Sequence, residues 1–392
     1  MAGRGLFKKW AIFRTFASGN YPAHIKANHL KYIGVGVIAG VSIYSSAAGI
    51  TVLAAQQEIS VKNFMCQPIT DIEKLKKKSD DMKTKMELLV MKTQADFCRA
   101  LESMEDPGTT FKVDRWTREA GGGGITCVLQ DGRVFEKAGV NISVVHGTLP
   151  PSAIQQMKSR GKSMQEGSLP FHAIGVSAVI HPRNPMVPTV HFNYRYFEIE
   201  NPDGTVQWWF GGGTDLTPYY LNEEDIKHFH GALKKACDKH NSQYYIDYKK
   251  WCDDYFVIPH RGERRGVGGI FFDDVDQPNQ EKAYEFVKSC AEAVIPSYIP
   301  LVKKHKDDPY GYAERQWQLL RRGRYVEFNL MYDRGTKFGL YTPGARYESI
   351  LMSLPLSANW QYMHEPALNS KEAALMEVLK NPKKWHFLLA GK

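Results

Sequence analysis

The hydrophobic pattern of residues 71–105 predicts a long amphipathic helix. Apolar residues recur there at steps of three and four among Lys, Asp and Glu, which gathers them on one face of an α-helix. Asp106-Pro107-Gly108 ends the pattern, because Pro and Gly interrupt helices. The same periodicity predicts further helices at residues 222–240, 244–255, 280–304 and 372–380.

Between these helices the pattern changes to the alternation that is typical of β-strands. Asp131-Gly132 separates two of the predicted strands as a two-residue hairpin, because Gly tolerates positive φ. Gly and Pro separate the others, with no room for crossover helices, so we expect antiparallel pairing. The predicted strands are residues 125–130, 133–136, 141–145, 173–180, 189–200, 206–210 and 268–273, with a last hairpin of 324–333 and 337–342 across Arg334-Gly335-Thr336.

These elements predict an α+β fold in a single domain, with a large antiparallel sheet flanked by helices on both sides. The chain shows no internal repeat, low-complexity tract or long linker. We expect residues 58–110 to form a helical N-terminal segment and residues 111–392 to form the main body.

The first 57 residues differ in character from the rest. Residues 1–31 contain six Lys or Arg and no Asp or Glu, which is typical of a mitochondrial transit peptide. Residues 32–57 carry no charge and are about long enough to cross a bilayer, since spanning takes roughly 20 residues. We expect 1–57 to be a transit peptide plus a hydrophobic sorting segment whose cleavage releases the body outside the matrix. Retention of 32–57 as an anchor is the alternative.

Charge and cysteine content exclude several classes of protein. The leader's basic residues account for most of the net charge of +9, and 45 basic against 42 acidic residues remain from position 58 onward. This near balance argues against nucleic-acid binding. The six Cys are scattered without a C-x-x-C pair, so buried free thiols are expected rather than zinc or iron–sulfur ligation.

One predicted strand carries a set of residues suited to chemistry. His191, Asn193 and Arg195 share one face of residues 189–200, and apolar or aromatic residues occupy the other face. Solvated strands usually carry Lys, Glu and Thr, so we interpret this trio as part of a site. Ser177 lies among small residues on the preceding strand, which leaves space above the sheet for a flat ligand.

Glycines and arginines suggest what that ligand is. Gly211-Gly212-Gly213 precedes Asp215 and is expected to be a flexible loop; it lacks the Lys-Ser/Thr ending of a P-loop, so close approach to a bulky ligand is favoured over nucleotide binding. Arginines bind carboxylates bidentately and suit a polycarboxylate ligand. Structural ion pairs with Asp273, Asp274 or Glu327 remain an equal alternative for each of them. The clustered arginines are Arg261, Arg264, Arg265, Arg321, Arg322, Arg324, Arg334 and Arg346.

From about residue 111 to its end the chain resembles the oxygen-dependent coproporphyrinogen-III oxidases of haem biosynthesis. The matching stretches are residues 115–124, 175–185, 191–198, 208–218, 260–266 and 321–344. The resemblance implies conversion of two propionates of coproporphyrinogen III to vinyl groups, with O2 as co-substrate and no other cofactor or metal. The implied products are protoporphyrinogen IX, CO2 and H2O2.

The resemblance also implies a homodimer in the mitochondrial intermembrane space, at most peripherally or transiently associated with the inner membrane. Its dimer contacts correspond to residues 126–135 and 325–361. It implies that His191 donates a proton. The chemistry of such a substrate adds that one carboxylate such as Asp215 is suited to accept several pyrrole N–H groups at the centre of the macrocycle. The implied catalytic residues are His191, Asp215, Asp333 and Arg334, and the implied substrate contacts are Ser177, Asn193, Tyr194, Arg195, Arg265, Gly344, Ala345 and Arg346.

Two alternatives to this activity stay open. A carrier of tetrapyrroles would use the same arginines without catalysis, since each charged hydrogen bond to a propionate contributes roughly 1.5–3 kcal/mol. A metal-dependent oxygenase would use histidines, because some bacterial relatives have been assigned a metal on four of them. The corresponding positions here are His181, His191, His230 and His260.

Overall fold

The computed structural model describes residues 59–159, 161–162, 164–165, 167–341 and 344–385. The predicted transit peptide and sorting segment lie outside these residues. None of the helices within the described ranges is both long enough and apolar enough to span a membrane. The described residues belong to one unit of the chain, residues 57–392.

A seven-stranded sheet forms the centre of this unit. Every neighbouring pair of strands is antiparallel, in the order β1-β2-β3-β4-β5-β6-β9, so the predicted sheet is confirmed. Its strands are β1 Lys112–Thr117, β2 Gly122–Gln130, β3 Phe135–Thr148, β4 Pro170–Pro182, β5 Thr189–Glu200, β6 Val206–Thr217 and β9 Gly268–Val275. A small ribbon of β7 Val257–Ile258 and β8 Glu263–Arg264 lies apart from the sheet.

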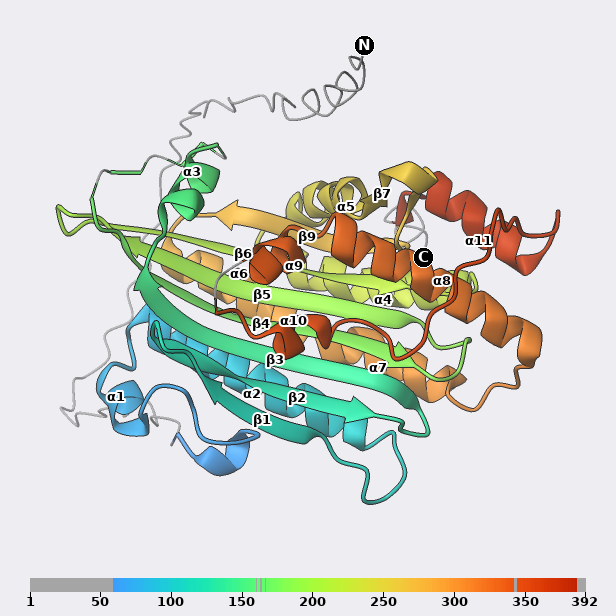
Figure 1. The fold of residues 1–392 in the computed structure, drawn as a ribbon, viewed down its shortest axis with the longest axis horizontal. Helices are drawn as coiled ribbons and strands as arrows, with labels where there is room; N and C mark the ends of the chain where they lie inside the picture. Colours follow the sequence, from blue (N-terminus) through green and yellow to red (C-terminus); the bar gives the residue numbers. More distant parts are fainter. Residues whose placement is uncertain (1–58, 160, 163, 166, 342–343, 386–392) are drawn as a thin grey trace, which may run out of the picture. The chain divides into compact units, whose positions relative to one another are not determined.

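Helices cover both faces of the sheet, as predicted. Figure 1 shows α2, α4, α6 and α7 behind it and α8, α9 and α10 in front. The helices are α1 Ile72–Lys77, α2 Met82–Glu102, α3 Pro151–Ser159, α4 Glu223–Asp238, α5 Tyr244–Tyr255, α6 Gln280–Glu292, α7 Val294–His305, α8 Tyr312–Met331, α9 Arg334–Tyr341, α10 Tyr347–Leu351 and α11 Lys371–Lys380. Two of the predicted helices are each divided into two, at residues 78–81 and at residue 293.

The core lies between the sheet and the helices behind it. Phe192, Tyr194 and Tyr196 of β5 are buried there, and Phe192 meets Phe97 of α2 edge to face with ring centroids 5.1 Å apart. Burial of each such side chain contributes roughly 1.5–3 kcal/mol. Because side chains alternate along a strand, this packing turns the residues between them toward the opposite face.

The hairpin predicted at residues 324–342 is wrong. Most of that segment lies in α8 and α9, which form a helical pair in front of the sheet (Figure 1). The alternation of Val326, Phe328 and Leu330 with polar residues imitates a strand. The buried face of α8 mixes apolar side chains such as Phe328 with charged ones, because Arg321 and Arg322 pair with buried Glu263 and Glu136 at 2.7 Å each. These buried arginines obscure the helical periodicity of the sequence.

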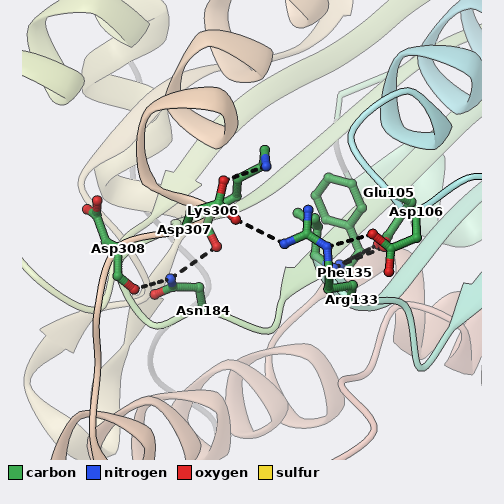
Figure 2. Close-up of polar contacts among 9 residues, drawn as sticks. Glu105, Asp106, Arg133, Phe135, Asn184, Lys306, Asp307 and Asp308 are labelled. Carbon is green, nitrogen blue, oxygen red and sulfur yellow. Dashed lines mark hydrogen bonds and ion pairs between the residues drawn. The ribbon is translucent and has the colours of Figure 1, made fainter.

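The turn between β2 and β3 is longer than the predicted two residues. It spans residues 131–134, and positive φ falls at Asp131 (φ 56°) rather than at Gly132. Polar contacts to distant segments hold this turn (Figure 2): Arg133 donates to Asp106 at 2.8 Å and to Asp307 at 2.9 Å. Glu105 accepts the backbone N–H of Phe135 at 2.6 Å. The predicted strand of residues 133–136 therefore lies partly in this turn. Its last two residues join residues 141–145 in the single long strand β3.

The expected loop at Gly211-Gly212-Gly213 is also wrong, because β6 continues through it to Thr217. Gly212 pairs with Tyr194 on one side and with Phe272 on the other. A Cβ atom on Gly212 would lie 2.6 Å from the Tyr194 ring. The glycines thus give room to neighbouring strands and their side chains.

The six cysteines are free, and all but Cys66 are buried, as predicted.

Candidate active site

The predicted trio lies on the sheet face that the core leaves open. His191, Asn193 and Arg195 are all partly exposed. Asp215 of β6 stands directly opposite His191, and Ser177 of β4 stands opposite Asn193. Directly opposed residues of neighbouring strands share a face. The sheet therefore brings together five residues that the sequence singled out.

His191, Asp215 and Arg265 form a chain of contacts at this face. His191 Nδ1 lies 2.6 Å from Asp215 Oδ1. Arg265 Nη2 donates to both oxygens of Asp215, at 2.9 and 2.7 Å. The Arg265 guanidinium lies 4.1 Å from the ring centroid of Phe256, and the rings of Tyr325 and Phe328 surround it further, which favours a buried cation.

The electrostatics of this chain keep Asp215 ionised. Burial alone would raise the pKa of Asp215, but the positive charge of Arg265 and the contact with His191 outweigh it and lower that pKa. Attraction to Asp215 correspondingly raises the pKa of Arg265 in spite of burial. Because an ionised carboxylate only accepts hydrogen bonds, Nδ1 of His191 must carry the proton between them. Nε2 is then the ring nitrogen of His191 that Asp215 does not engage.

Asp215 and Arg265 are less accessible than expected from the sequence. Their side chains are 3% and 1% exposed, and they pair with each other. Neither side chain reaches the open face as a free charge. This arrangement suits a role behind His191 better than direct contact with a ligand.

Arg195 and Arg334 come together through Asp273, which the sequence offered only as a structural ion-pair partner of arginines such as Arg334 and not as part of the site. Asp273 of β9 lies 2.8 Å from Arg195 Nη2 and 3.5 Å from Arg334 Nη2. The side chains of Arg195 and Arg334 are 39% and 46% exposed, whereas that of Asp273 is 5% exposed. No sequence motif identifies Asp273, since it becomes a neighbour of both arginines only when β9 joins the sheet beside β6.

Asp333 supports the segment that carries Arg334. Its carboxylate accepts the backbone N–H of Thr336 at 2.7 Å and the Tyr255 hydroxyl at 3.0 Å. An acid that accepts N–H groups at the start of a helix stabilises that start. Asp333 therefore anchors the beginning of α9 on α5.

Gly344, Ala345 and Arg346 lie nearer the other edge of the sheet. Arg346 pairs with Asp114 of β1. Asp114 belongs to a row that crosses the sheet to Asn193 of β5, and four strand spacings correspond to about 19 Å. Tyr194 is separated from the trio, because its side chain is buried on the opposite face and bonds Thr214 at 2.5 Å.

The four histidines of the metal-dependent alternative have separate surroundings. His181 bonds the Ser353 carbonyl at 2.8 Å, and His230 bonds the Tyr245 hydroxyl at 2.9 Å. His260 bonds Glu327 at 2.7 Å. In the part of the chain that the structure describes, no three His, Cys, Asp or Glu residues are grouped so that they could hold a metal ion.

Comparison with known proteins decides the family. The coproporphyrinogen III oxidase family matches residues 85–385, which is well over half of the chain. The chain belongs to this family. Among curated relatives of the coproporphyrinogen III oxidase family, it is 66% identical to the oxygen-dependent coproporphyrinogen-III oxidase of Drosophila melanogaster over 354 residues, covering 90% of this chain and 91% of the relative.

Other members of the coproporphyrinogen III oxidase family come from mammals and plants. The mitochondrial oxygen-dependent coproporphyrinogen-III oxidase of Homo sapiens is 65% identical over 325 residues, 82% of this chain and 71% of the relative. The chloroplastic one of Glycine max is 54% identical over 311 residues, 78% of this chain and 80% of the relative. The family resemblance noted in the sequence is thus confirmed.

Proposed function

We infer that this chain catalyses the oxygen-dependent oxidative decarboxylation of coproporphyrinogen III in haem biosynthesis. The observation that carries this function is the 66% identity, over 90% of the chain, to an oxidase of that name. The alternative of a non-catalytic carrier has no comparable support. Two propionates become vinyl groups, and the product is protoporphyrinogen IX.

The proton balance of the reaction requires a proton donor. For each propionate, the carboxyl group leaves as CO2, the CH2 attached to the pyrrole loses one proton, and the two electrons released pass to O2. H2O2 needs two protons, so one comes from that CH2 and one more is taken up. We propose that His191 supplies or relays this proton through Nε2, since histidine exchanges protons near neutral pH. The ionised Asp215, 2.6 Å from Nδ1, supports this role because it orients the ring.

We propose that Arg195 and Arg334 bind propionates of the substrate, with Ser177 and Asn193 beside them. Both guanidiniums are partly exposed, and arginine matches a carboxylate bidentately. Burial of Arg265 favours a different role from the propionate contact expected from sequence, namely holding Asp215 in place. Gly344, Ala345 and Arg346 remain proposed contacts at the β1 side of the same face.

The protein is a mitochondrial enzyme, as its mammalian relatives are. We propose the intermembrane space as its compartment, with residues 1–57 as the import signal, because a cationic leader followed by an uncharged stretch is suited to arrest at the inner membrane. We also propose that residues 58–110 and 111–392 together form the mature enzyme.

We propose a homodimer that uses residues 126–135 and 325–361. Large apolar side chains are exposed in the second of these segments, and contiguous exposed apolar surface commonly marks an interface. The exposed side chains are Leu330, Met331, Phe338, Tyr341, Tyr347, Leu351, Leu356 and Trp360.

The function is tested by turnover of coproporphyrinogen III by the chain lacking residues 1–57, with and without O2 and with and without a chelator. We propose that O2 is the co-substrate and that no other cofactor is needed, so protoporphyrinogen should form only with O2 and should survive the chelator. Activity lost with the chelator would support the metal-dependent alternative. Binding without turnover would support the carrier.

A further inference from the structure

We propose that Asp273 is a positioning residue that holds Arg195 and Arg334 together as one clamp for a substrate carboxylate. This inference rests on the proposed function, since it concerns how the same site recognises a propionate. The Asp273 carboxylate spans the two guanidiniums, with Oδ1 2.8 Å from Arg195 and Oδ2 3.5 Å from Arg334. Its 5% exposure leaves it little access to a ligand, so it acts through the arginines.

An irregularity of the sheet brings Asp273 to this position. Phe210 pairs with Val275 and Gly212 pairs with Phe272, so β9 has one residue more than β6 between these pairs. The backbone of Asp274 takes a positive φ of 55° there. Such bulges redirect side chains and occur often beside active sites. The extra residue lets the carboxylate of Asp273 reach over β6 to Arg195 of β5.

Gly211 leaves the space in which the two charges meet. A Cβ atom at this position would lie 2.7 Å from Arg195 Cζ and 2.7 Å from Asp273 Oδ1. Any side chain there would push the ion pair apart. Gly211 is therefore required for the contact between Arg195 and Asp273.

Each arginine also has a second support. Arg195 Nη1 donates to Asn193 Oδ1, and the Arg334 guanidinium lies 5.0 Å from the ring centroid of Tyr255. Two guanidiniums brought together repel each other, and one shared carboxylate offsets that repulsion while leaving a net positive charge. The exposed N–H groups of the pair remain available to a carboxylate ligand.

The direction in which a charge-removing mutation changes ligand affinity shows whether Asp273 positions the arginines or only neutralises them. If Asp273 only competed with the substrate for the arginines, Asp273→Asn would strengthen the binding of a tetracarboxylate. If Asp273 positions the arginines, the same change should weaken binding, because two like charges would separate. Asp274→Asn is the matched control: it removes the same charge one residue away, Asn tolerates positive φ, and the Asp274 carboxylate faces Lys162 at 3.5 Å.

The experiment measures KM and kcat for coproporphyrinogen III and the Kd of coproporphyrin III, a stable tetracarboxylate probe, for wild type and variants. Asp273→Asn should raise KM and Kd about tenfold or more, the effect of losing one charged contact, and change kcat less than about threefold. Asp273→Glu should recover part of the affinity. Asp274→Asn should leave KM and Kd within about twofold of wild type.

Gly211→Ala provides a second variant that keeps every charge. Like Asp273→Asn, it should raise the Kd of coproporphyrin III. Circular dichroism checks that each variant is folded. Unchanged or tighter probe binding in folded Asp273→Asn, or in Gly211→Ala if Asp273→Asn does not fold, would overturn the positioning role. If the wild-type protein binds the probe but does not turn over coproporphyrinogen III, the proposed function is refuted. The positioning role of Asp273 is still tested in that case, because it depends on the Kd values of wild type and variants.

Discussion

At the scale of single residues, burial changes what an aspartate and an arginine of the site can do. Asp215 and Arg265 form a buried pair, 2.7 Å apart, beneath His191. Breaking a buried ion pair by removing one partner commonly costs about 3–5 kcal/mol, because the other charge stays behind. Asp215 therefore contributes both to folding stability and to the orientation of His191.

This dual role predicts different results for two neighbouring substitutions. His191→Gln should lower kcat by about 100-fold or more, the usual contribution of an acid–base group, with less than about 2 kcal/mol lost from the free energy of unfolding. Asp215→Asn should lower kcat similarly and also cost about 3–5 kcal/mol, since Arg265 loses its partner. Steady-state kinetics and urea unfolding measure both quantities. Wild-type kcat in His191→Gln would contradict the proposed proton transfer.

At the scale of elements, a buried histidine links three segments that support Arg265. His230 of α4 bonds the Tyr245 hydroxyl of α5 at 2.9 Å and the Val267 carbonyl at 3.2 Å, two residues after Arg265. Burial lowers the pKa of His230 from 6.5 to about 3. The folded protein keeps this ring neutral, while the unfolded chain protonates it below about pH 6.5.

The lowered pKa predicts the direction of acid destabilisation. Between about pH 6.5 and pH 3 the unfolded chain binds the extra proton, so the free energy of unfolding decreases as the pH falls, by about 1.4 kcal/mol per pH unit from this group. Above about pH 6.5 this effect disappears. His230→Gln should therefore flatten the dependence of Tm on pH between about 4 and 6.5. His228→Gln, which changes an exposed residue of the same helix, should leave the slope unaltered, and an equal slope in both variants would contradict the assignment.

At the scale of the whole molecule, the exposed apolar surface on α8–α10 is the feature that a monomer explains least well. Phe338 of α9 is 52% exposed, and its helix begins with Arg334. A dimer that covers this surface would also fix the helix that carries a proposed substrate contact. Assembly and substrate binding would then depend on the same segment.

The proposed dimer predicts the effect of a charge at this surface. Phe338→Asp should shift the protein lacking residues 1–57 from dimer toward monomer at micromolar concentration, because a buried unpaired carboxylate opposes association. Sedimentation velocity measures the change. Tyr312→Asp is the control, since Tyr312 is 81% exposed but lies outside residues 325–361. A wild-type protein that is already monomeric, or a Phe338→Asp dimer of wild-type stability, would refute this interface.

Much of the fold and part of the site could be predicted from the sequence. The alternation of β5 is a local property with a period of two, so the order of residues alone places His191, Asn193 and Arg195 on one face. Short connections between strands likewise indicate antiparallel pairing. Family membership follows from long matching stretches, which also depend only on residue order.

Only the tertiary structure decided which charges meet. Asp273 and Arg334 are 61 residues apart, and no periodicity links them; the bulge in β9 and the start of α9 bring them together. The buried face of α8 contains arginines that pair with acids from other segments. These charges obscured the helical periodicity of this part of the sequence. Local patterns determine which face a side chain takes, whereas ion pairs between distant segments depend on how those faces are finally packed.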